Sequence, residues 1–309
     1  MSSTEKAYFS YSYELPSQEF GQLFAKTSDY RGARFFWQTP DRHLSYIGLG
    51  TVKQFFNAET EFEAIERFKN EFFKSFCMVS KRKEAPILFG GFPFDREGAK
   101  ESFWGKLENG YFVLPEILFT QREDFCVVTL TCHQEKGTCD SEFFKRLEKH
   151  FESLENEVAN LLDHPPVESS CTNVVRKERN VGAFVSLVDE SVEEIKKTNA
   201  KLRKVVLARQ MELKGKSFSI ETIVENLLRQ QPNTYVFALE DKQQAFVGAT
   251  PERLVEASRT MFATAGIAGS ISRGKNQTED QENSLKLLKD AKNSYEHQVV
   301  VERIKKQLK

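Results

Sequence analysis

The sequence has almost no net charge and no long hydrophobic run. Its 44 Lys and Arg residues balance 45 Asp and Glu residues, so the formal net charge of the 309 residues is −1. Neither a basic surface for nucleic acid nor an acidic solvating tail is therefore expected. The apolar runs are far shorter than a membrane span, and the N-terminal residues Met-Ser-Ser-Thr-Glu-Lys lack the apolar stretch of a signal peptide. We therefore expect a cytoplasmic protein without nucleic-acid or membrane partners.

Disulfide patterns and the common catalytic motifs are also missing. The five cysteines are odd in number and irregularly spaced, which argues against a disulfide framework. The chain has no P-loop, no Gly-x-Gly-x-x-Gly, no His-Glu-x-x-His and no Gly-x-Ser-x-Gly. Phenylalanine is abundant instead, with 27 residues at strand-like or helix-facing positions, and this indicates a packed globular core rather than a stacking surface.

Residues 1–165 combine strands and helices in no regular βαβ order. Residues 1–57 have the pattern of strands and turns. Apolar residues three or four positions apart predict helices over about 59–78 and 141–162. Extended segments are expected at 34–37, 44–48, 86–94, 111–114 and 125–130.

Two prolines and a Ser-rich stretch, from His164 to Thr172, predict a linker before a second region at 175–309. In this region we expect helices at about 181–199, 219–230 and 278–309, and strands at 203–211, 234–240 and 244–248.

Three segments of the second region are candidates for chemistry, and the first is Lys-Val-Val-Leu-Ala-Arg at 204–209. On a strand, Lys204 shares a face with the apolar Val206. Burial among apolar side chains favours the neutral form of a lysine, which is the form that acts as a general base. The alternative is a lysine at a strand edge whose ammonium group simply reaches water. The pattern leaves both open.

The second segment is Thr-Pro-Glu at 250–252, directly after a predicted strand. Thr250 suits a helix N-cap, Pro251 suits the first helical position, and Glu252 complements the helix dipole. A glutamate at a strand end is equally well placed to enter a cleft and act as a general acid. Spacing does not choose between these interpretations.

The third segment is rich in small residues and includes Ala268, Gly269 and Ser270. A backbone of this kind can approach a ligand closely, and its amides can bind a carboxylate. Further on, Glu296 lies near the apolar stripe of the final predicted helix. A carboxylate there could hold Mg²⁺ together with substrate oxygens, although most helix glutamates simply face solvent.

In their order and spacing, these segments resemble the chorismate-utilising enzymes. The matching stretches are Lys-Val-Val-Leu-Ala-Arg at 204–209, Phe-Val-Gly-Ala-Thr-Pro-Glu-Arg-Leu at 246–254, Ala-Gly-Ser at 268–270 with Arg-Gly at 273–274, and Glu-His at 296–297. The resemblance implies an α+β fold of the anthranilate synthase component I type. In that fold large antiparallel sheets pack as a sandwich with outer helices, and residues 1–165 are interleaved with the catalytic region 175–309.

Two positions indicate which type of enzyme the resemblance implies. The anthranilate and aminodeoxychorismate enzymes carry Gln where this chain has Lys204, and the aminodeoxychorismate enzyme carries a nucleophilic lysine where this chain has Ala268. Water, rather than ammonia, is then the expected nucleophile, which leaves isochorismate synthase and salicylate synthase. The motif around Lys204 and the N-terminal half favour an isochorismate synthase of the menaquinone type, with the siderophore type close behind.

The resemblance also implies a role for each site residue. Lys204 would deprotonate a water molecule that attacks C2 of chorismate, and Glu252 would protonate the hydroxyl that leaves C4. Mg²⁺, held partly by Glu296, would anchor the ring carboxylate of the substrate. Gly269 and Ser270 would offer backbone and hydroxyl contacts to it. We expect a monomer that acts on this small molecule.

The sequence departs from the family pattern in three respects. Ser270 stands where the family usually has Thr, and Asn293 replaces a Glu that several relatives carry three residues before Glu296. Family members also run well beyond Lys309, so we expect this chain to be C-terminally truncated, with an incomplete set of magnesium ligands and exposed sheet edges. A truncated, non-catalytic remnant is therefore the alternative to an active enzyme.

Overall fold

The chain forms two compact units, Met1–Ser170 with Phe218–Pro251 and Cys171–Ser217 with Glu252–Lys309. Residues 218–251, which the sequence placed in the catalytic region, thus belong to the first unit. The computed structural model describes residues 8–56, 62–79, 84–94, 110–134, 141–166, 174–258 and 260–308. Residues 167–172 of the predicted linker lie outside these ranges.

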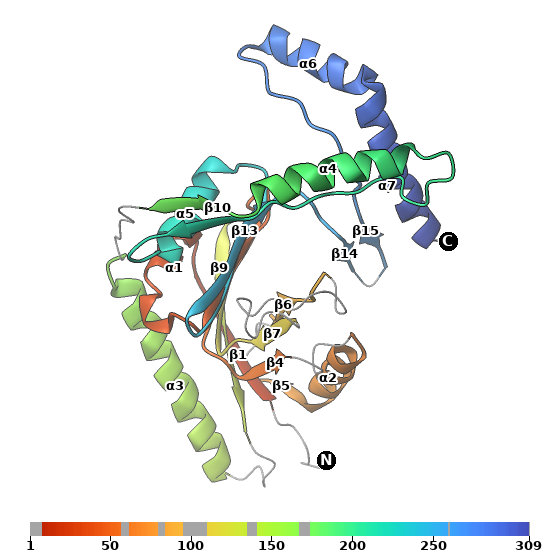
Figure 1. The fold of residues 1–309 in the computed structure, drawn as a ribbon. Coiled ribbons are helices and arrows are strands. Elements are labelled where there is room, and N and C mark those ends of the chain that lie inside the picture. The colour runs from red at the N-terminus through yellow and green to blue at the C-terminus, as the bar shows by residue number, and fades with distance from the viewer. Residues whose placement is uncertain are drawn as a thin grey trace. The chain divides into compact units, whose positions relative to one another are not determined.

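A sheet of eight strands forms the centre of the first unit (Figure 1). In chain order the strands are β1 (Tyr8–Pro16), β2 (Arg34–Gln38), β3 (Leu44–Leu49), β5 (Phe76–Met78), β8 (Ile117–Arg122), β9 (Phe125–His133), β12 (Tyr235–Asp241) and β13 (Gln244–Thr250). They lie in the order β13-β12-β2-β3-β8-β9-β1-β5, antiparallel except for the parallel pair β1 and β5. The late strands β12 and β13 therefore extend the sheet beyond β2.

Helices cover one face of this sheet. They are α1 (Phe20–Ala25), α3 (Ser141–Asp163) and α5 (Ile220–Gln230). The helix α3 packs on the strands through residues at intervals of three or four, namely Phe143, Leu147, Phe151, Leu154, Val158 and Leu161. The apolar period therefore predicted α3 and α5 to within one residue at each end, and both predictions are confirmed.

The short helix α1 was not expected, because residues 1–57 have the pattern of strands and turns. Glu19 caps its N-terminus and accepts hydrogen bonds from the backbone N–H groups of Gly21 and Gln22. Phe20 and Phe24 are buried in the core beneath the sheet. A helix of about one and a half turns is too short to produce a recognisable apolar period, which is why the sequence did not reveal α1.

The opposite face of the sheet carries a second, smaller sheet. Its strands are β4 (Lys53–Phe56), β7 (Tyr111–Leu114) and β6 (Phe89–Gly91), in the order β4-β7-β6. The Phe89 ring stacks on the Phe35 ring with centroids 3.4 Å apart. Gly48 leaves room for this pair, since a Cβ atom there would lie 1.9 Å from the Phe35 ring. The predicted α+β architecture with packed sheets and outer helices is confirmed.

The helix predicted over 59–78 ends earlier than expected. The observed helix α2 spans Phe62–Ser75, and the next residues, Phe76–Met78, form strand β5 beside β1. The Phe72 and Phe76 rings stay stacked across this junction, 4.9 Å apart. Residues with helical spacing thus adopt the extended conformation because an edge of the large sheet is available to pair with them.

A buried ion network joins the early and late parts of the first unit. The Arg34 side chain is fully buried, and its guanidinium donates to Glu221 Oε1 and to Glu240 Oε1, each at 2.7 Å. Arg31, which is half-exposed, donates to the same Glu221 oxygen at 2.9 Å. Burial alone would raise the pKa of Glu221, but hydrogen bonds from Ser219, from its own backbone N–H and from the two arginines lower that pKa to about 2.

The second unit has fewer buried side chains. Its elements are β10 (Val175–Glu178), α4 (Val181–Lys196), β11 (Met211–Lys214), β14 (Glu256–Ala257), β15 (Phe262–Ala263), α6 (Gln277–Lys289) and α7 (Ala291–Gln307). The helices α4, α6 and α7 contain no fully buried residue among those described. Across the described parts of both units, no helix combines the length and the apolar character needed to cross a membrane.

Two predicted elements of the second unit are wrong. Residues 203–210 are irregular rather than a strand, and pairing with β10 begins only at Met211. A strand forms when a neighbour accepts and donates its backbone hydrogen bonds, and among the described residues 203–210 have no such ladder. The helix predicted over 278–309 is broken at Asp290, which is extended and caps α7 by accepting from the Asn293 N–H at 2.7 Å.

Candidate functional site

The structure places every candidate site residue in the second unit. They are distributed over three pieces of it: an irregular segment before β11, a hairpin around β14 and β15, and the helix α7. These residues are Lys204, Glu252, Ala268, Gly269, Ser270 and Glu296.

Glu252 begins one arm of the hairpin. Strands β14 and β15 pair Glu256 with Ala263, and the Thr264 hydroxyl donates to the Leu254 carbonyl at 2.7 Å. Glu252 lies four residues before the first paired residue, Glu256, on an irregular stretch. No helix follows Thr250, so the helix-start interpretation of this segment is wrong.

The second arm of the hairpin lies against α7. Gly269 has a φ of +78°, and a Cβ atom there would lie 2.8 Å from Asn293 Oδ1. At Gly266 a Cβ atom would lie 3.3 Å from the Val300 side chain. Only glycine fits at 269 without strain, because the backbone is left-handed and Asn293 fills the space where a side chain would go. Ser270, directly after this contact, is exposed.

Glu296 lies on the part of α7 that carries these contacts. It is one turn after Asn293 and one turn before Val300, so the three residues lie on the same side of the helix. Its side chain is half-buried. The structure thus brings the Glu252 hairpin, the Ala-Gly-Ser segment and the Glu296 helix into one connected assembly.

Lys204 lies on the irregular segment and is half-buried. The segment is fixed at its far end, where Arg209 forms an ion pair with Glu178 at 2.6 Å and the Gln210 carbonyl accepts from the Arg179 N–H. Within the residues that the structure describes, these contacts belong to β10 and β11 rather than to the hairpin or α7.

The described residues do not by themselves make a magnesium site. Mg²⁺ prefers about six oxygen ligands in a near-octahedral arrangement, some of them from water or substrate. Where side chains are described, no three His, Cys, Asp or Glu residues are placed to hold one metal ion. Glu296 therefore offers a single carboxylate.

Arg273, which belongs to the motif that resembles the family, has a local partner that the sequence did not reveal. Its guanidinium binds both carboxylate oxygens of Asp280, and the Gly274 N–H donates to the same carboxylate at 2.8 Å. Hydrogen bonds from Arg273 first, and then from the Gly274 backbone, lower the pKa of Asp280. Arg273 thus holds the turn into α6. The seven-residue spacing was too long to suggest a pair within one helix turn.

We expect Gly269→Ala to destabilise the second unit by about 2 kcal/mol, because alanine resists the left-handed conformation and its methyl group would collide with Asn293. Hydrogen exchange of the α7 amides should become faster. Gly182→Ala in α4 is the matched control, since nothing lies within 4 Å of a Cβ atom there. Equal exchange rates in the two variants would contradict the contact between the hairpin and α7.

Comparisons with known proteins agree on one family. The family model described as "Chorismate binding enzyme" matches residues 1–309. The chain is 31% identical over 283 residues to the isochorismate synthase MenF of Bacillus subtilis, a match that covers 88% of this chain and 58% of that protein. It is 27% identical over 299 residues to the salicylate biosynthesis isochorismate synthase of Pseudomonas aeruginosa, covering 95% of this chain and 60% of that protein.

A solved structure shares the fold. The menaquinone-specific isochorismate synthase MenF from Escherichia coli superimposes with a TM-score of 0.74 at 19% identity, over 99% of this chain and 64% of that one. At this identity the likeness establishes the architecture alone. The chain spans less than two thirds of the length of these relatives.

Proposed function

Because this chain belongs to the family of chorismate-binding enzymes, we propose that it catalyses the conversion of chorismate to isochorismate, as an isochorismate synthase of the menaquinone type. The proposal rests on the identity of residue 204. This chain has Lys204 at the position where the ammonia-using relatives are expected to carry Gln. The 31% identity to an isochorismate synthase supports the same choice. Salicylate synthase, which would also eliminate pyruvate, is the second candidate.

The reaction exchanges one hydroxyl for another and needs a base and an acid. Lys204 takes a proton from a water molecule as that water attacks C2 of chorismate. The ring double bonds shift, and the C4 hydroxyl leaves as water after it receives a proton from Glu252. The net change is an isomerisation, because one water is consumed and one is released. The backbone of Ala268 and Gly269 and the Ser270 hydroxyl orient the substrate.

We also propose that the enzyme is cytoplasmic and depends on Mg²⁺, held in part by Glu296. When bound, the ion would neutralise charge on a substrate carboxylate. The half-buried position of Glu296 beside the Ala-Gly-Ser arm supports this role. Further oxygen ligands have to come from the substrate, from water or from residues beyond those described.

The test is incubation of the purified chain with chorismate and Mg²⁺, with the products separated by chromatography. Isochorismate as the main product is expected, and it can be confirmed with an isochorismate-consuming enzyme. Salicylate, recognised by its fluorescence, would favour the second candidate instead. A folded chain with a cooperative unfolding transition and no turnover would contradict the proposal for this chain and favour a non-catalytic remnant.

A further inference from the structure

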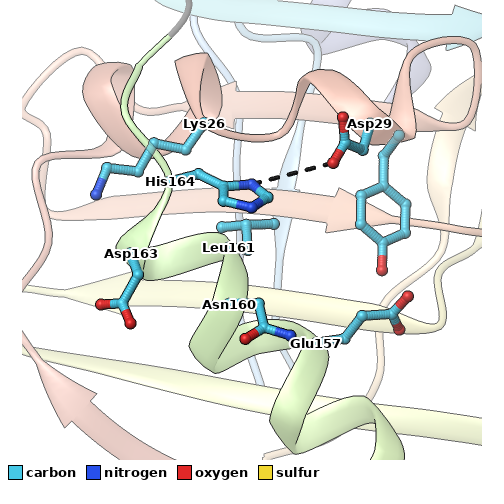
Figure 2. A pocket seen from close by; sticks show the side chains of 8 residues that line it. Lys26, Asp29, Glu157, Asn160, Leu161, Asp163 and His164 are labelled. Atoms are coloured by element: carbon cyan, nitrogen blue, oxygen red, sulfur yellow. Dashed lines mark ion pairs between the residues drawn. The ribbon is translucent and has the colours of Figure 1, made fainter.

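Two hollows of the first unit are lined by none of the candidate site residues. They have volumes of about 380 and 440 Å³, and both lie against α3. Figure 2 shows the first of them, where His164 at the end of α3 faces Asp29 with Nδ1 and Oδ2 4.0 Å apart. The supports of the candidate site lie instead within the second unit, where all of its residues are.

The segment 266–270, which includes the proposed substrate contacts, follows α7 in an extended conformation. A Cβ atom at Gly266 would lie 3.3 Å from the Val300 side chain, and one at Gly269 would lie 2.8 Å from Asn293 Oδ1. The segment thus advances from 266 to 269 while the helix goes back from 300 to 293. Three extended residues span about 10 Å and seven helical residues about 10.5 Å, so the two lengths agree. The segment therefore runs antiparallel to α7.

Glu296 lies between these two contacts. It follows Asn293 by one turn and precedes Val300 by one turn, so it shares their side of α7. Residues 267–268 span the same interval of the segment, and their backbone therefore passes the turn of the helix that carries Glu296. Asn293 thus lies at one end of the interval in which the backbone of the segment and the Glu296 carboxylate are expected to be neighbours.

Asn293 is a neutral residue at a position where a helix favours a carboxylate. Asp290 is the N-cap of α7 and accepts a hydrogen bond from the Asn293 N–H at 2.7 Å, so Asn293 is the third residue of the helix. Negative charge in the first turn stabilises a helix, and Glu is favoured at this third position. The first turn of α7 nevertheless contains no acidic residue. The stability of the helix start therefore does not explain the amide.

The amide fits the neighbouring segment instead. The Asn293 side chain is half-buried and fills the space in which a Cβ atom of Gly269 would lie. Chorismate, the substrate of the proposed function, carries two carboxylates, and backbone amides of the segment can bind one of them. Glu296 already supplies one negative charge at this place. A second carboxylate one turn away would repel the substrate, whereas an amide supports the segment without adding charge.

We propose that Asn293 is a positioning residue of the proposed reaction. Its side chain holds the segment 266–270 in place to receive a substrate carboxylate, and its neutrality keeps a second negative charge away from Glu296. This role rests on the proposed function, because chorismate is its ligand. Shape and charge are separable: adding charge to the same shape should weaken substrate binding, and removing the shape should loosen the segment.

The experiment on charge is isothermal titration calorimetry of chorismate with the full chain carrying Lys204→Ala, which keeps the substrate from being consumed. Saturating Mg²⁺ excludes effects on metal affinity. Adding Asn293→Asp should weaken binding about tenfold at low salt. The loss should shrink in 1 M salt, where the screening length falls to about 3 Å. The urea midpoint should stay the same or rise, because negative charge favours the helix start.

The matched control is Ser294→Asp. It adds the same charge at the next residue of α7, which is exposed and points to a different side of the helix. Chorismate should bind this variant like the Lys204→Ala chain.

The experiment on shape uses Asn293→Ala. Hydrogen exchange of the α7 amides at 296–300, which the segment covers, should become faster in this variant and stay unchanged in Asn293→Asp. The weakening of chorismate binding by Asn293→Ala should not depend on salt, because no charge is added. Unchanged exchange in Asn293→Ala would overturn the supporting role of the side chain.

Three further results would overturn the proposal. The first is equal binding of chorismate with and without Asn293→Asp. The second is an equal loss in Ser294→Asp. The third is a loss in Asn293→Asp that persists in 1 M salt or comes with a lower urea midpoint, which would show structural damage. In these cases the Lys204→Ala chain still binds chorismate and the proposed function stands. A Lys204→Ala chain that binds no chorismate would overturn the proposed function together with this role.

Discussion

Replacing Lys204 with alanine is expected to reduce chorismate turnover by about 10²- to 10⁴-fold, the usual contribution of a general base. Glu252→Gln, which keeps the shape of the side chain but cannot donate the same proton, should cause a loss of similar size. Both variants should lower kcat more than they raise KM, because proton transfer occurs in the transition state. Initial rates of isochorismate formation at several chorismate concentrations separate the two parameters.

The controls for these variants come from the same segments. Lys201→Ala removes an exposed lysine three residues before Lys204, and Glu256→Gln removes an exposed glutamate from the Glu252 hairpin. Both should keep turnover close to that of the unchanged chain. Full turnover in Lys204→Ala would rule out Lys204 as the base. If Lys201→Ala lost as much activity as Lys204→Ala, the effect would come from the fold of the segment.

Arg34→Leu is expected to lower the free energy of unfolding of the first unit by about 3–5 kcal/mol. The substitution removes the guanidinium that the buried carboxylates share. Glu221 keeps Arg31, but Glu240 loses the one counter-charge among its described ion pairs, and an unpaired buried charge is far more costly than a missing surface contact. Urea unfolding followed by circular dichroism measures this change.

Arg31→Leu is the matched control, because Arg31 contacts the same Glu221 oxygen from a half-exposed position. It should cost no more than about 1 kcal/mol. The acid dependence gives a second readout. Since the pKa of Glu221 is lowered from 4.5 to about 2, its contribution to stability is complete above pH 4.5 and is lost as the pH falls toward 2. Equal costs for the two arginine variants would show that Arg34 is not the centre of the network.

Predictions from the sequence were most accurate for helices and strands whose apolar pattern is visible within the element itself. The helix α3 has an apolar residue at every third or fourth position over its whole length, and β12 and β13 are apolar runs joined by a polar turn. The strand expected at 203–211 failed for the opposite reason. Its residues favour a strand, but a strand also needs a neighbour, and nothing in a local pattern reveals whether one is present.

The same distinction applies to the candidate site: local features could be predicted from the sequence, and long-range contacts could not. The resemblance to the family made Gly269 and Glu296 candidate site residues, but the sequence could not show that Gly269 packs on Asn293 one turn before Glu296. It missed the Arg34 network entirely, because Arg34 and its two glutamates are 187 and 206 residues apart. Long-range pairs of this kind leave no periodic pattern in a single sequence.

The order of the strands has a consequence for how the protein is made. A ribosome synthesises β2 early and β12 about 200 residues later, with residues 171–217 of the other unit in between. Until β12 and α5 emerge, the nascent sheet ends at β2, and Arg34 has neither of its counter-charges. The first unit is therefore expected to complete its fold only after β12 and α5 have been synthesised, and its β2 edge is the surface that a chaperone would have to protect until then.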